Sequence, residues 1–406
     1  MSFQQGLSGL NVAAKSLDAI GNNIANASTV GFKAARAEFA DVFASSLAGG
    51  GGVQVGIGAK VAAVRQQFTQ GNIATTSNPL DVAINGNGFF RLSTNGTVTY
   101  TRNGQFSLDR DGYLVTANGA RLTGYPADAN GQIVASTPID LQVSLANIAP
   151  RATSEAWMSL NLDSREAVPT SAFSLANPAS YNSSTAMTVY DSQGNSHTLT
   201  TYFRKTAANT WEVYAAADGA LINGGTPIGT LNFNANGTLA ADVTMNVSIP
   251  LANGAATPLA FPLTFPMSDM TQFGVNFAVS ELRQDGFTTG RLAGFAIGDD
   301  GVILGRYSNG QSRAMGQIVL ANFVNAQGLV SLGNNQWAES ADSGQPLVAS
   351  PGSGTLGVVQ SGALEEANVD LTEELVKMIT AQRVYQANAQ TIRTQDQIQQ
   401  TLVNLR

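Results

Sequence analysis

Narrow apolar stripes at the two ends of the chain constrain its fold more than any other feature. Near the N-terminus, apolar or small residues recur at alternating spacings of four and three, at Phe3, Leu7, Leu10, Ala14, Leu17, Gly21 and Ile24. The C-terminal stripe holds Leu371, Leu375, Met378, Gln382, Tyr385, Ala389 and Ile392, then drifts to Ile398, Leu402 and Leu405. This spacing predicts helices with a coiled-coil seam. Because helices with so narrow a stripe are marginal alone in water, we expect them to pair with each other or with other subunits.

Capping residues mark the start of the C-terminal helix. Asp370 is placed to be its N-cap, and Glu373 lies three residues later as the partner of a capping box. The sequence therefore predicts a helix that begins directly after Asp370.

The middle of the chain, from about residue 72 to 360, has the residue pattern of a β-protein. Short alternating runs are separated by turn dipeptides of the kind that favours hairpins. These are Asn95-Gly96, Asn103-Gly104, Asp111-Gly112, Asn118-Gly119, Asn236-Gly237 and Asn309-Gly310. Many short strands at this spacing predict β-sandwich or barrel-like domains.

These observations predict a multidomain fold. The terminal helices, residues 1–30 and 370–406, form a coiled-coil inner domain, and a connector of residues 31–71 and 359–369 follows it. If the ends pair, their flanking segments lie side by side, so residues 72–145 and 285–358 form one discontinuous inner β-domain. Residues 146–284 are then a second, outer β-domain inserted into it. The run Gly49 to Gly52 is expected to be a flexible or irregular part of the connector.

Composition excludes several classes of function. The net charge is −7 and no Lys/Arg cluster occurs, so we expect no nucleic-acid partner. The absence of cysteine excludes disulfides and thiolate metal sites. No apolar run is long enough for a membrane span, and no cleavable signal peptide is visible. Charged residues make up 12% of the chain, about half the usual share, which suits packing against copies of itself but also suits secreted β-proteins.

Candidate chemical sites are weak. His197 is the only histidine, and its turn-to-strand setting indicates a structural or merely exposed role. The fragments Asp109-Arg110-Asp111-Gly112 and Asp299-Asp300-Gly301 resemble calcium loops but lack the full ligand set, so we interpret both as turns. We therefore expect no catalytic, cofactor-binding or metal-binding residues, and no cofactor.

Several segments at the chain ends and in the β-rich middle form recognisable motifs. Leu17 to Asn26, followed by Thr29 to Lys33, is similar to the N-terminal signature of the flagellar rod and hook proteins, a family of bacterial axial proteins. Ser361 to Glu365, Ala367 to Leu371 and Met378 to Ala389 resemble its C-terminal signature, and Gly86 to Phe90, Arg102 to Phe106 and Gly119 to Tyr125 resemble its shared β-domain. The signature positions that we single out are Asn22, Asn23, Ala25, Asn26, Gly31, Phe32, Lys33, Asn368, Asp370 and Arg383.

The inserted domain separates the hook proteins from the rod proteins of this family. The resemblance implies that rod proteins are shorter and lack such an insertion, whereas Val189 to Asn195 and Phe233 to Leu239 look like outer-domain motifs of hook proteins. A distal rod subunit, which would form a rigid shaft, is the nearest alternative. A secreted β-rich adhesin is a third interpretation, and an enzyme would need a cluster of titratable residues that we do not find.

The resemblance implies a structural subunit and no enzyme. Such subunits are exported without a cleaved signal through the flagellar type III apparatus to the extracellular hook. There they polymerise into a curved, flexible tube, a universal joint that carries torque from rod to filament and encloses the export channel. Expected partners are further copies of the chain, the distal rod, the hook cap, the hook-filament junction proteins and the export apparatus. The axial coiled coil is expected to use Phe3, Leu7, Leu10, Leu17, Ile24, Leu371, Leu375, Met378, Tyr385, Ile392 and Leu402.

Overall fold

The computed structural model describes residues 2–42, 56, 58–128 and 130–404, and the side chains of Ser2, Leu402 and Asn404 lie outside this description. The chain divides into two compact units. Unit 1 comprises Met1–Leu145, Gly294–Arg306 and Ser312–Arg406, and unit 2 comprises Ala146–Ala293 and Tyr307–Gln311. Unit 2 is thus inserted into the sequence of unit 1. The finer division into four parts stays a prediction.

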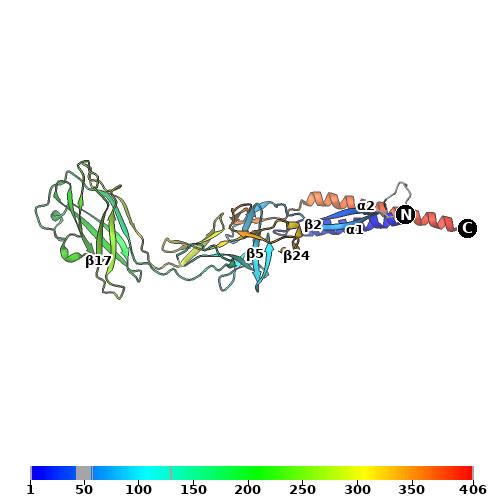
Figure 1. Ribbon diagram of the computed structural model, residues 1–406, viewed down its shortest axis with the longest axis horizontal. Coiled ribbons are helices and arrows are strands. Elements are labelled where there is room, and N and C mark those ends of the chain that lie inside the picture. The colour runs from blue at the N-terminus through cyan, green and yellow to red at the C-terminus, as the bar shows by residue number, and fades with distance from the viewer. Residues whose placement is uncertain (1, 43–55, 57, 129, 405–406) are drawn as a thin grey trace. The chain divides into compact units, whose positions relative to one another are not determined.

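Helices α1 (Ser2–Ala25) and α2 (Leu371–Asn404) occupy the two ends of the chain and lie side by side in unit 1 (Figure 1). The predicted N-cap of α2 is present, because the Oδ1 atom of Asp370 accepts hydrogen bonds from the backbone N–H of Thr372 (2.8 Å) and Glu373 (3.1 Å). The reciprocal half of the predicted capping box is not found. The Glu373 carboxylate instead lies 3.0 Å from Lys377 Nζ, one turn further along the exposed helix surface.

A β-hairpin follows α1 and packs against it. Strands β1 (Ala35–Val42) and β2 (Gly58–Gln66) pair antiparallel, with an irregularity between Glu38 and Phe39. The hairpin falls within residues 31–71, which the sequence had indicated only as a connector. The glycine run Gly49 to Gly52 lies outside the described residues.

The rest of unit 1 is a branched antiparallel sheet with shorter ladders beside it. The main path of the sheet runs in the order β20 (Leu292–Ile297), β21 (Val302–Tyr307), β22 (Ser312–Ile318), β9 (Arg121–Pro126), β5 (Phe89–Thr94), β6 (Thr97–Thr101), β25 (Gln336–Ala338) and β24 (Val330–Gly333). Short strands extend it, namely β7 (Ser107–Leu108), β8 (Leu114–Val115), β10 (Ile139–Asp140), β23 (Leu320–Asn322) and β26 (Leu347–Ala349). Separate ladders join β27 (Val358–Ser361) to β4 (Val82–Asn85) and β28 (Ala363–Glu365) to β3 (Ile73–Thr75).

One predicted hairpin illustrates how local sequence sets the turns of this sheet. Strands β5 and β6 are joined by Asn95 and Gly96, whose φ angles are 51° and 87°. Two consecutive residues with positive φ are typical of the tight hairpin turn that Asn-Gly favours. The prediction made from this dipeptide is confirmed.

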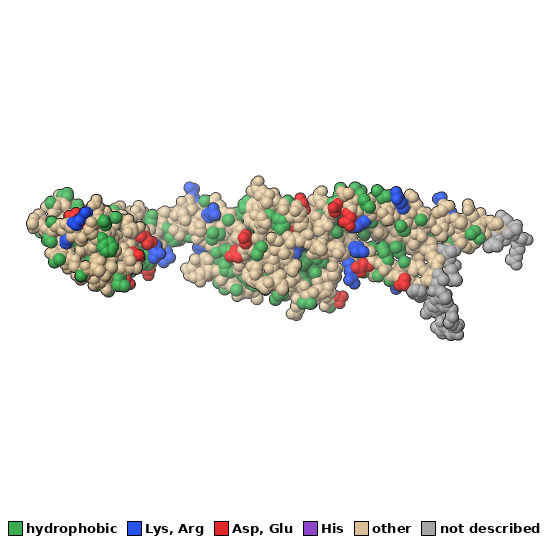
Figure 2. All heavy atoms as spheres, turned by 90° about the horizontal axis from the view of Figure 1, so that it is seen from above, with side chains coloured by type: hydrophobic (Ala, Val, Ile, Leu, Met, Phe, Trp, Pro, Cys, Tyr) green, Lys and Arg blue, Asp and Glu red, His purple; other side chains and the backbone are tan. Residues whose placement is uncertain are grey.

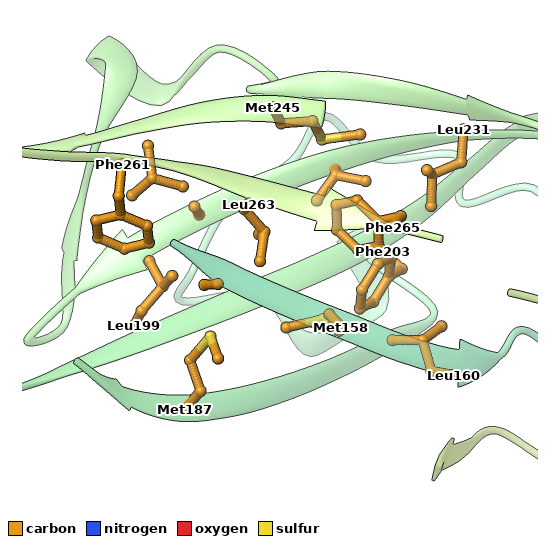
Figure 3. Packing of buried hydrophobic residues seen from close by; sticks show 14 of the residues in the cluster. Met158, Leu160, Met187, Leu199, Phe203, Leu231, Met245, Phe261, Leu263 and Phe265 are labelled. Carbon is orange, nitrogen blue, oxygen red and sulfur yellow. The ribbon is translucent and has the colours of Figure 1, made fainter. Parts of the chain in front are cut away.

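Unit 2 is a sandwich of two β-sheets. One sheet has the order β17 (Val243–Ile249), β18 (Leu259–Phe265), β11 (Ala156–Asn161) and β19 (Ala278–Gln284). The other has the order β12 (Ser183–Tyr190), β13 (Ser196–Ala207), β14 (Thr210–Ala217) and β15 (Ala220–Leu221), with β16 (Gly229–Asn232) also paired to β14. Figure 3 shows their shared core, in which side chains such as Met158, Phe203 and Phe265 pack together. Short 3-10 turns lie at Pro178–Ser180 and Asn223–Gly225 here, and at Ala326–Gly328 in unit 1.

The surface carries few charges, as the composition predicts. Figure 2 shows Lys, Arg, Asp and Glu side chains scattered among a much larger area of neutral polar side chains and backbone. Within the described part of the chain, no helix combines the length and the apolar character of a membrane span.

Candidate assembly site at the chain ends

Small residues of α1 allow a close contact between α1 and α2. A β-carbon at Gly6 would lie 2.9 Å from Ile392 Cγ1, and one at Gly9 would lie 2.6 Å from Asn388 Oδ1. Glycine at these two positions therefore allows the helices to approach closely. On α2, buried Ala381 lies between these contacts and the start of the helix.

Several large apolar side chains of the two helices remain exposed. Phe3 and Leu7 of α1 are 46% and 47% exposed. On α2 the exposed apolar residues are Leu371, Leu375, Val376, Ile379, Val384, Tyr385, Ile398 and Val403. A run of apolar side chains left in water on adjacent turns is typical of a surface that binds another molecule.

The predicted seam residues consequently fall into separate groups. Phe3, Leu7, Leu371, Leu375 and Tyr385 are exposed, whereas Leu10, Leu17, Ile24, Met378 and Ile392 are half-buried. Leu402 lies in α2, but its side chain is outside the described residues. The role of all these residues in an axial coiled coil stays a prediction.

Asn23 connects three elements near the end of α1. Its side-chain Nδ2 donates to the carbonyl oxygen of Ala35 (2.9 Å) and to Glu374 Oε2 (3.2 Å), while its Oδ1 accepts from the backbone N–H of Ala35 (2.8 Å). Asn23 and Glu374 are both buried, and Lys377 Nζ donates to the second oxygen of Glu374 (2.8 Å). The amide therefore joins α1 to the first residue of β1 and to the first turn of α2.

The end of α1 is shaped by the other signature residues. Asn26 Nδ2 donates to the Asn22 carbonyl oxygen (2.9 Å), which also accepts from the Asn26 backbone N–H (3.1 Å). Gly31 has a φ of +69°, and its N–H donates to the Glu365 carbonyl oxygen (2.8 Å). A β-carbon at Gly31 would lie 2.6 Å from the backbone nitrogen of Asn103, so a side chain does not fit there.

Asn368 holds the returning chain against the outgoing one. Its Oδ1 accepts from the Ala34 N–H (2.7 Å), and its Nδ2 donates to the Gln67 carbonyl oxygen (2.7 Å) and to Thr69 Oγ1 (2.8 Å). The amide thus replaces backbone partners on both sides of the β1–β2 hairpin. Of the other signature residues, Phe32 is buried, whereas Ala25, Asn22 and Arg383 are exposed.

The segment after α1, the segment before α2 and the sheet of unit 1 meet at what we call the junction. A buried cluster of charges lies at its centre. Glu365 Oε1 is 2.6 Å from Lys33 Nζ and accepts from the Gly71 N–H (2.8 Å), and Glu365 Oε2 is 3.1 Å from Arg102 Nη1. The side chains of Lys33 and Glu365 have no solvent exposure, and that of Arg102 has 4%. Lys33 Nζ also donates to the Thr69 carbonyl oxygen (2.7 Å). We call Lys33, Glu365 and Arg102 the charge cluster.

The electrostatics of the charge cluster make it sensitive to the loss of any member. Burial lowers the pKa of Lys33 from its usual value, and the adjacent Glu365 opposes this effect by stabilising the ammonium. Burial likewise lowers the pKa of Arg102, again against the attraction of Glu365. Arg102 Nη2 donates to the Gly86 carbonyl oxygen (2.8 Å), but its Nε is a buried donor without a partner. One carboxylate therefore compensates two buried cations.

Sequence reasoning identified Lys33 but not its partners. Glu365 and Arg102 occur in the signature segments, yet nothing in their local sequence indicates an ion pair across 332 and 263 residues. The one sequence signal for a buried charge was the position of Lys33 directly after Phe32, which the structure shows to be buried. The described residues contain no group of three or more His, Cys, Asp or Glu side chains that could hold a metal ion.

Comparison with known families covers most of the chain. Residues 3–33 match the description "Flagella basal body rod protein", and residues 83–156 match "Flagellar hook protein FlgE/F/G D1 domain". Residues 161–287 match "Flagellar basal body protein FlaE D2 domain", and residues 360–405 match "Flagellar basal body rod FlgEFG protein C-terminal".

Relatives that match over their full length share the name flagellar hook protein FlgE. The chain is 48% identical to flagellar hook protein FlgE of Salmonella typhimurium, with all of both chains covered, and 47% identical to that of Escherichia coli, again in full. It is 35% identical to the protein of Borreliella burgdorferi, covering 100% of this chain and 99% of the relative. The crystal structure of Helicobacter pylori FlgE2 shares the fold, with a TM-score of 0.52 and 16% identity over 72% of this chain and 100% of that one. The chain belongs to the flagellar hook protein family.

Proposed function

We propose that this hook-family chain is a structural subunit that polymerises with copies of itself into the curved, flexible tube of the hook. The observation that carries the proposal is the row of exposed apolar side chains on α1 and α2. These helices already pack on each other, so the exposed residues are free to contact the helices of neighbouring subunits. A contact between unlike surfaces generates a helical filament when its rotation does not close into a ring.

Burial of these side chains between subunits would favour assembly. Complete burial of one Leu, Ile or Val side chain stabilises by about 1.5–3 kcal/mol. Leu7, Leu375 and Ile379 are each close to half exposed in the single chain. Each subunit in a helical lattice would bury these residues against several neighbours, so modest gains add up along the tube.

The charge cluster supports a mechanical role for the junction. It connects the segment after α1, the segment before α2 and the sheet of unit 1 through buried ion pairs. A load applied to the helices would therefore pass directly into the β-sheet. In this proposal the outer β-domain contacts neighbours through neutral polar groups, which exchange readily with water while the tube rotates in its bent state.

The proposal includes the route and the neighbours of the subunit. The chain would leave the cell through the flagellar type III apparatus without a cleaved signal and act outside the cell, with no catalytic activity. Its partners would be the distal rod, the hook cap and the hook-filament junction proteins. The tube would transmit torque from rod to filament and enclose the export channel.

Electron microscopy of assembly reactions tests the role of the helix surfaces. We expect Leu7→Glu and Leu375→Glu to abolish tubes, because each places a carboxylate on a surface that assembly would remove from water. Both positions are exposed in the single chain, so the monomer should stay folded by circular dichroism. The matched control is Val324→Glu, an apolar side chain of unit 1 that is 97% exposed and lies outside the helices.

The outcomes separate the candidate functions. Curved tubes from the unmodified chain and from Val324→Glu, with monomers from the helix variants, would support the proposal. Normal tubes from both helix variants would contradict assembly through the terminal helices. Straight, rigid tubes from the unmodified chain would favour the rod alternative.

A further inference from the structure

A cluster of polar side chains joins three turns at one end of the unit 2 sandwich. Asp191 begins the turn between β12 and β13, and its Oδ1 accepts from the backbone N–H groups of Gln193 and Asn195, each at 2.9 Å. The Asp191 side chain is fully buried. A buried carboxylate must be compensated, and the neighbouring turns supply its partners.

The second carboxylate oxygen of Asp191 accepts a hydrogen bond from a loop of the other sheet. Its Oδ2 accepts from Asn253 Nδ2 (2.6 Å), which lies in the loop between β17 and β18. The same loop is bonded a second time, because the Ala256 N–H donates to Ser192 Oγ (2.9 Å). Asp191 therefore connects the β12–β13 turn of one sheet to the 250–258 loop of the other.

His197 brings a third turn into the cluster. Its Nδ1 lies 2.7 Å from Asp218 Oδ2, and its Nε2 lies 3.4 Å from Asp191 Oδ2. Asp218 belongs to the turn between β14 and β15, where its Oδ1 also accepts from the Thr198 N–H (2.8 Å). The imidazole therefore lies between the Asp191 carboxylate of the β12–β13 turn and the Asp218 carboxylate of the β14–β15 turn. The His197 side chain is only 12% exposed.

The protonation state of His197 decides whether the ring can donate to both carboxylates at once, while Asp191 Oδ2 also accepts from Asn195 Nδ2 (2.9 Å) and Asn253 Nδ2 (2.6 Å). A neutral imidazole carries one N–H, whereas the protonated ring carries two. If the neutral ring donates from Nδ1 to Asp218, its Nε2 lone pair faces the Asp191 carboxylate. The ionisable groups facing the ring are Asp191 and Asp218, and the 250–258 loop contributes the neutral amide of Asn253. Among the described residues, no ion pair or hydrogen bond joins a Lys or Arg to this cluster.

We propose that His197 is a proton-dependent clasp that links the β12–β13 turn to the β14–β15 turn when it is protonated, and that it thereby steadies the Asp191 carboxylate to which the 250–258 loop is bonded. Loss of the proton weakens the link between the two turns, so that this end of unit 2 opens more often. The rigidity of the end of the sandwich then responds to the pH of its surroundings. This inference concerns unit 2 of the single chain and does not depend on polymerisation.

The direction of the pH effect follows from the environment of the ring. The hydrogen bond to Asp218 raises the pKa of His197 above its usual 6.5, against the opposing effect of burial. A raised pKa in the folded chain means that the stabilisation is fully present below about pH 6.5 and is lost as pH rises through the folded pKa. Each unit of elevation corresponds to about a tenfold change in the opening equilibrium.

The chain offers a direct test because His197 is its only histidine. In the full-length chain, labelled histidine gives one imidazole NMR signal, whose titration reports the pKa of His197. We expect a value above 6.5. We also expect amide hydrogen exchange in segments 190–197, 214–222 and 250–258, corrected for the intrinsic rate, to quicken several-fold between pH 5.5 and pH 8.5.

Variants separate the clasp from an inert buried histidine. His197→Gln should remove the pH dependence of exchange in the three segments, and Asp218→Asn should lower the pKa of His197. Asp109→Asn is the control, since Asp109 holds a similar turn in unit 1 without a histidine partner. A histidine pKa at or below 6.5, pH-independent exchange in the unmodified chain, or pH dependence that persists in His197→Gln would overturn the proposal. The NMR titration of the unmodified chain decides the matter even if a variant fails to fold.

Discussion

Replacing Glu365 with glutamine is the sharpest single perturbation of the junction. Glu365→Gln keeps the size of the side chain but removes the carboxylate that, among the described residues, alone pairs with Lys33 Nζ (2.6 Å) and Arg102 Nη1 (3.1 Å). It also turns an acceptor into a group with an amide donor, beside the Gly71 N–H that now donates to it. Two buried cations would then lack compensation.

The expected cost is large relative to the stability of a domain. Removing one partner of a buried ion pair costs about 3–5 kcal/mol, because the other partner stays buried and charged. Lys33 can limit this cost by releasing its proton, since burial already lowers its pKa. We therefore expect a loss of about 3 kcal/mol, against a total stability of about 5–15 kcal/mol for a typical domain.

Segment-resolved hydrogen exchange in increasing urea measures this loss where it occurs. Protection should fall in strands β3, β4, β27 and β28 of unit 1, while the strands of unit 2 serve as an internal reference. Glu366→Gln is the matched control, because Glu366 is the adjacent residue but is exposed, and among the described contacts its side chain accepts only from Asn72 Nδ2 (3.0 Å). Adding Lys33→Met to Glu365→Gln should recover part of the loss, since it removes one uncompensated cation.

Two results would refute the reasoning. A loss below about 1 kcal/mol would mean that the charge cluster contributes no more than an exposed ion pair. An equal loss in Glu366→Gln would mean that the effect comes from the strand position and not from the buried charges.

The remaining predictions concern the helix contact. Gly21→Ala should stabilise α1 by about 0.5–1 kcal/mol, because no atom beyond the neighbouring backbone of α1 lies within 4 Å of the added carbon. Gly9→Ala should give no gain or a loss, because its added carbon would lie 2.6 Å from the side-chain oxygen of Asn388 in α2. Thermal melting of the two variants compares them directly, and equal gains would contradict the close approach of the helices. Asn23→Asp should cost about 1–3 kcal/mol at pH 7, because a buried donor 3.2 Å from Glu374 Oε2 becomes a second carboxylate. Melting curves should show partial recovery near pH 4, where carboxyl groups take up protons, and Asn22→Asp, at an exposed position, should show neither effect.

Local features of the fold were predictable from the sequence. The periodic stripes predicted both terminal helices, and Asp370 marked the first turn of α2. Asn95-Gly96 predicted the β5–β6 hairpin turn. Each of these features depends on backbone preferences and hydrogen bonds within a few residues, so neighbouring residues alone suffice to specify it.

The choice of helix face was not predictable in this way. The sequence ranks Leu371 and Leu375 as seam residues, but the structure buries Glu374 and Ala381 and leaves both leucines exposed. The partner helix explains the difference, because α1 presents glycines and the Asn23 amide to α2. Several large apolar side chains of both helices therefore stay exposed in the single chain.

The sequence by itself determined the helices, the turns, the low surface charge and the family resemblance. Only the tertiary structure decided that Lys33 meets Glu365 across 332 residues, that the β1–β2 hairpin packs on α1, and that His197 lies between two carboxylates. The physical reason is the range of the interactions. Periodicity and turn chemistry act between near neighbours, whereas a buried charge acquires its partner only when folding brings distant segments into contact and removes the water between them.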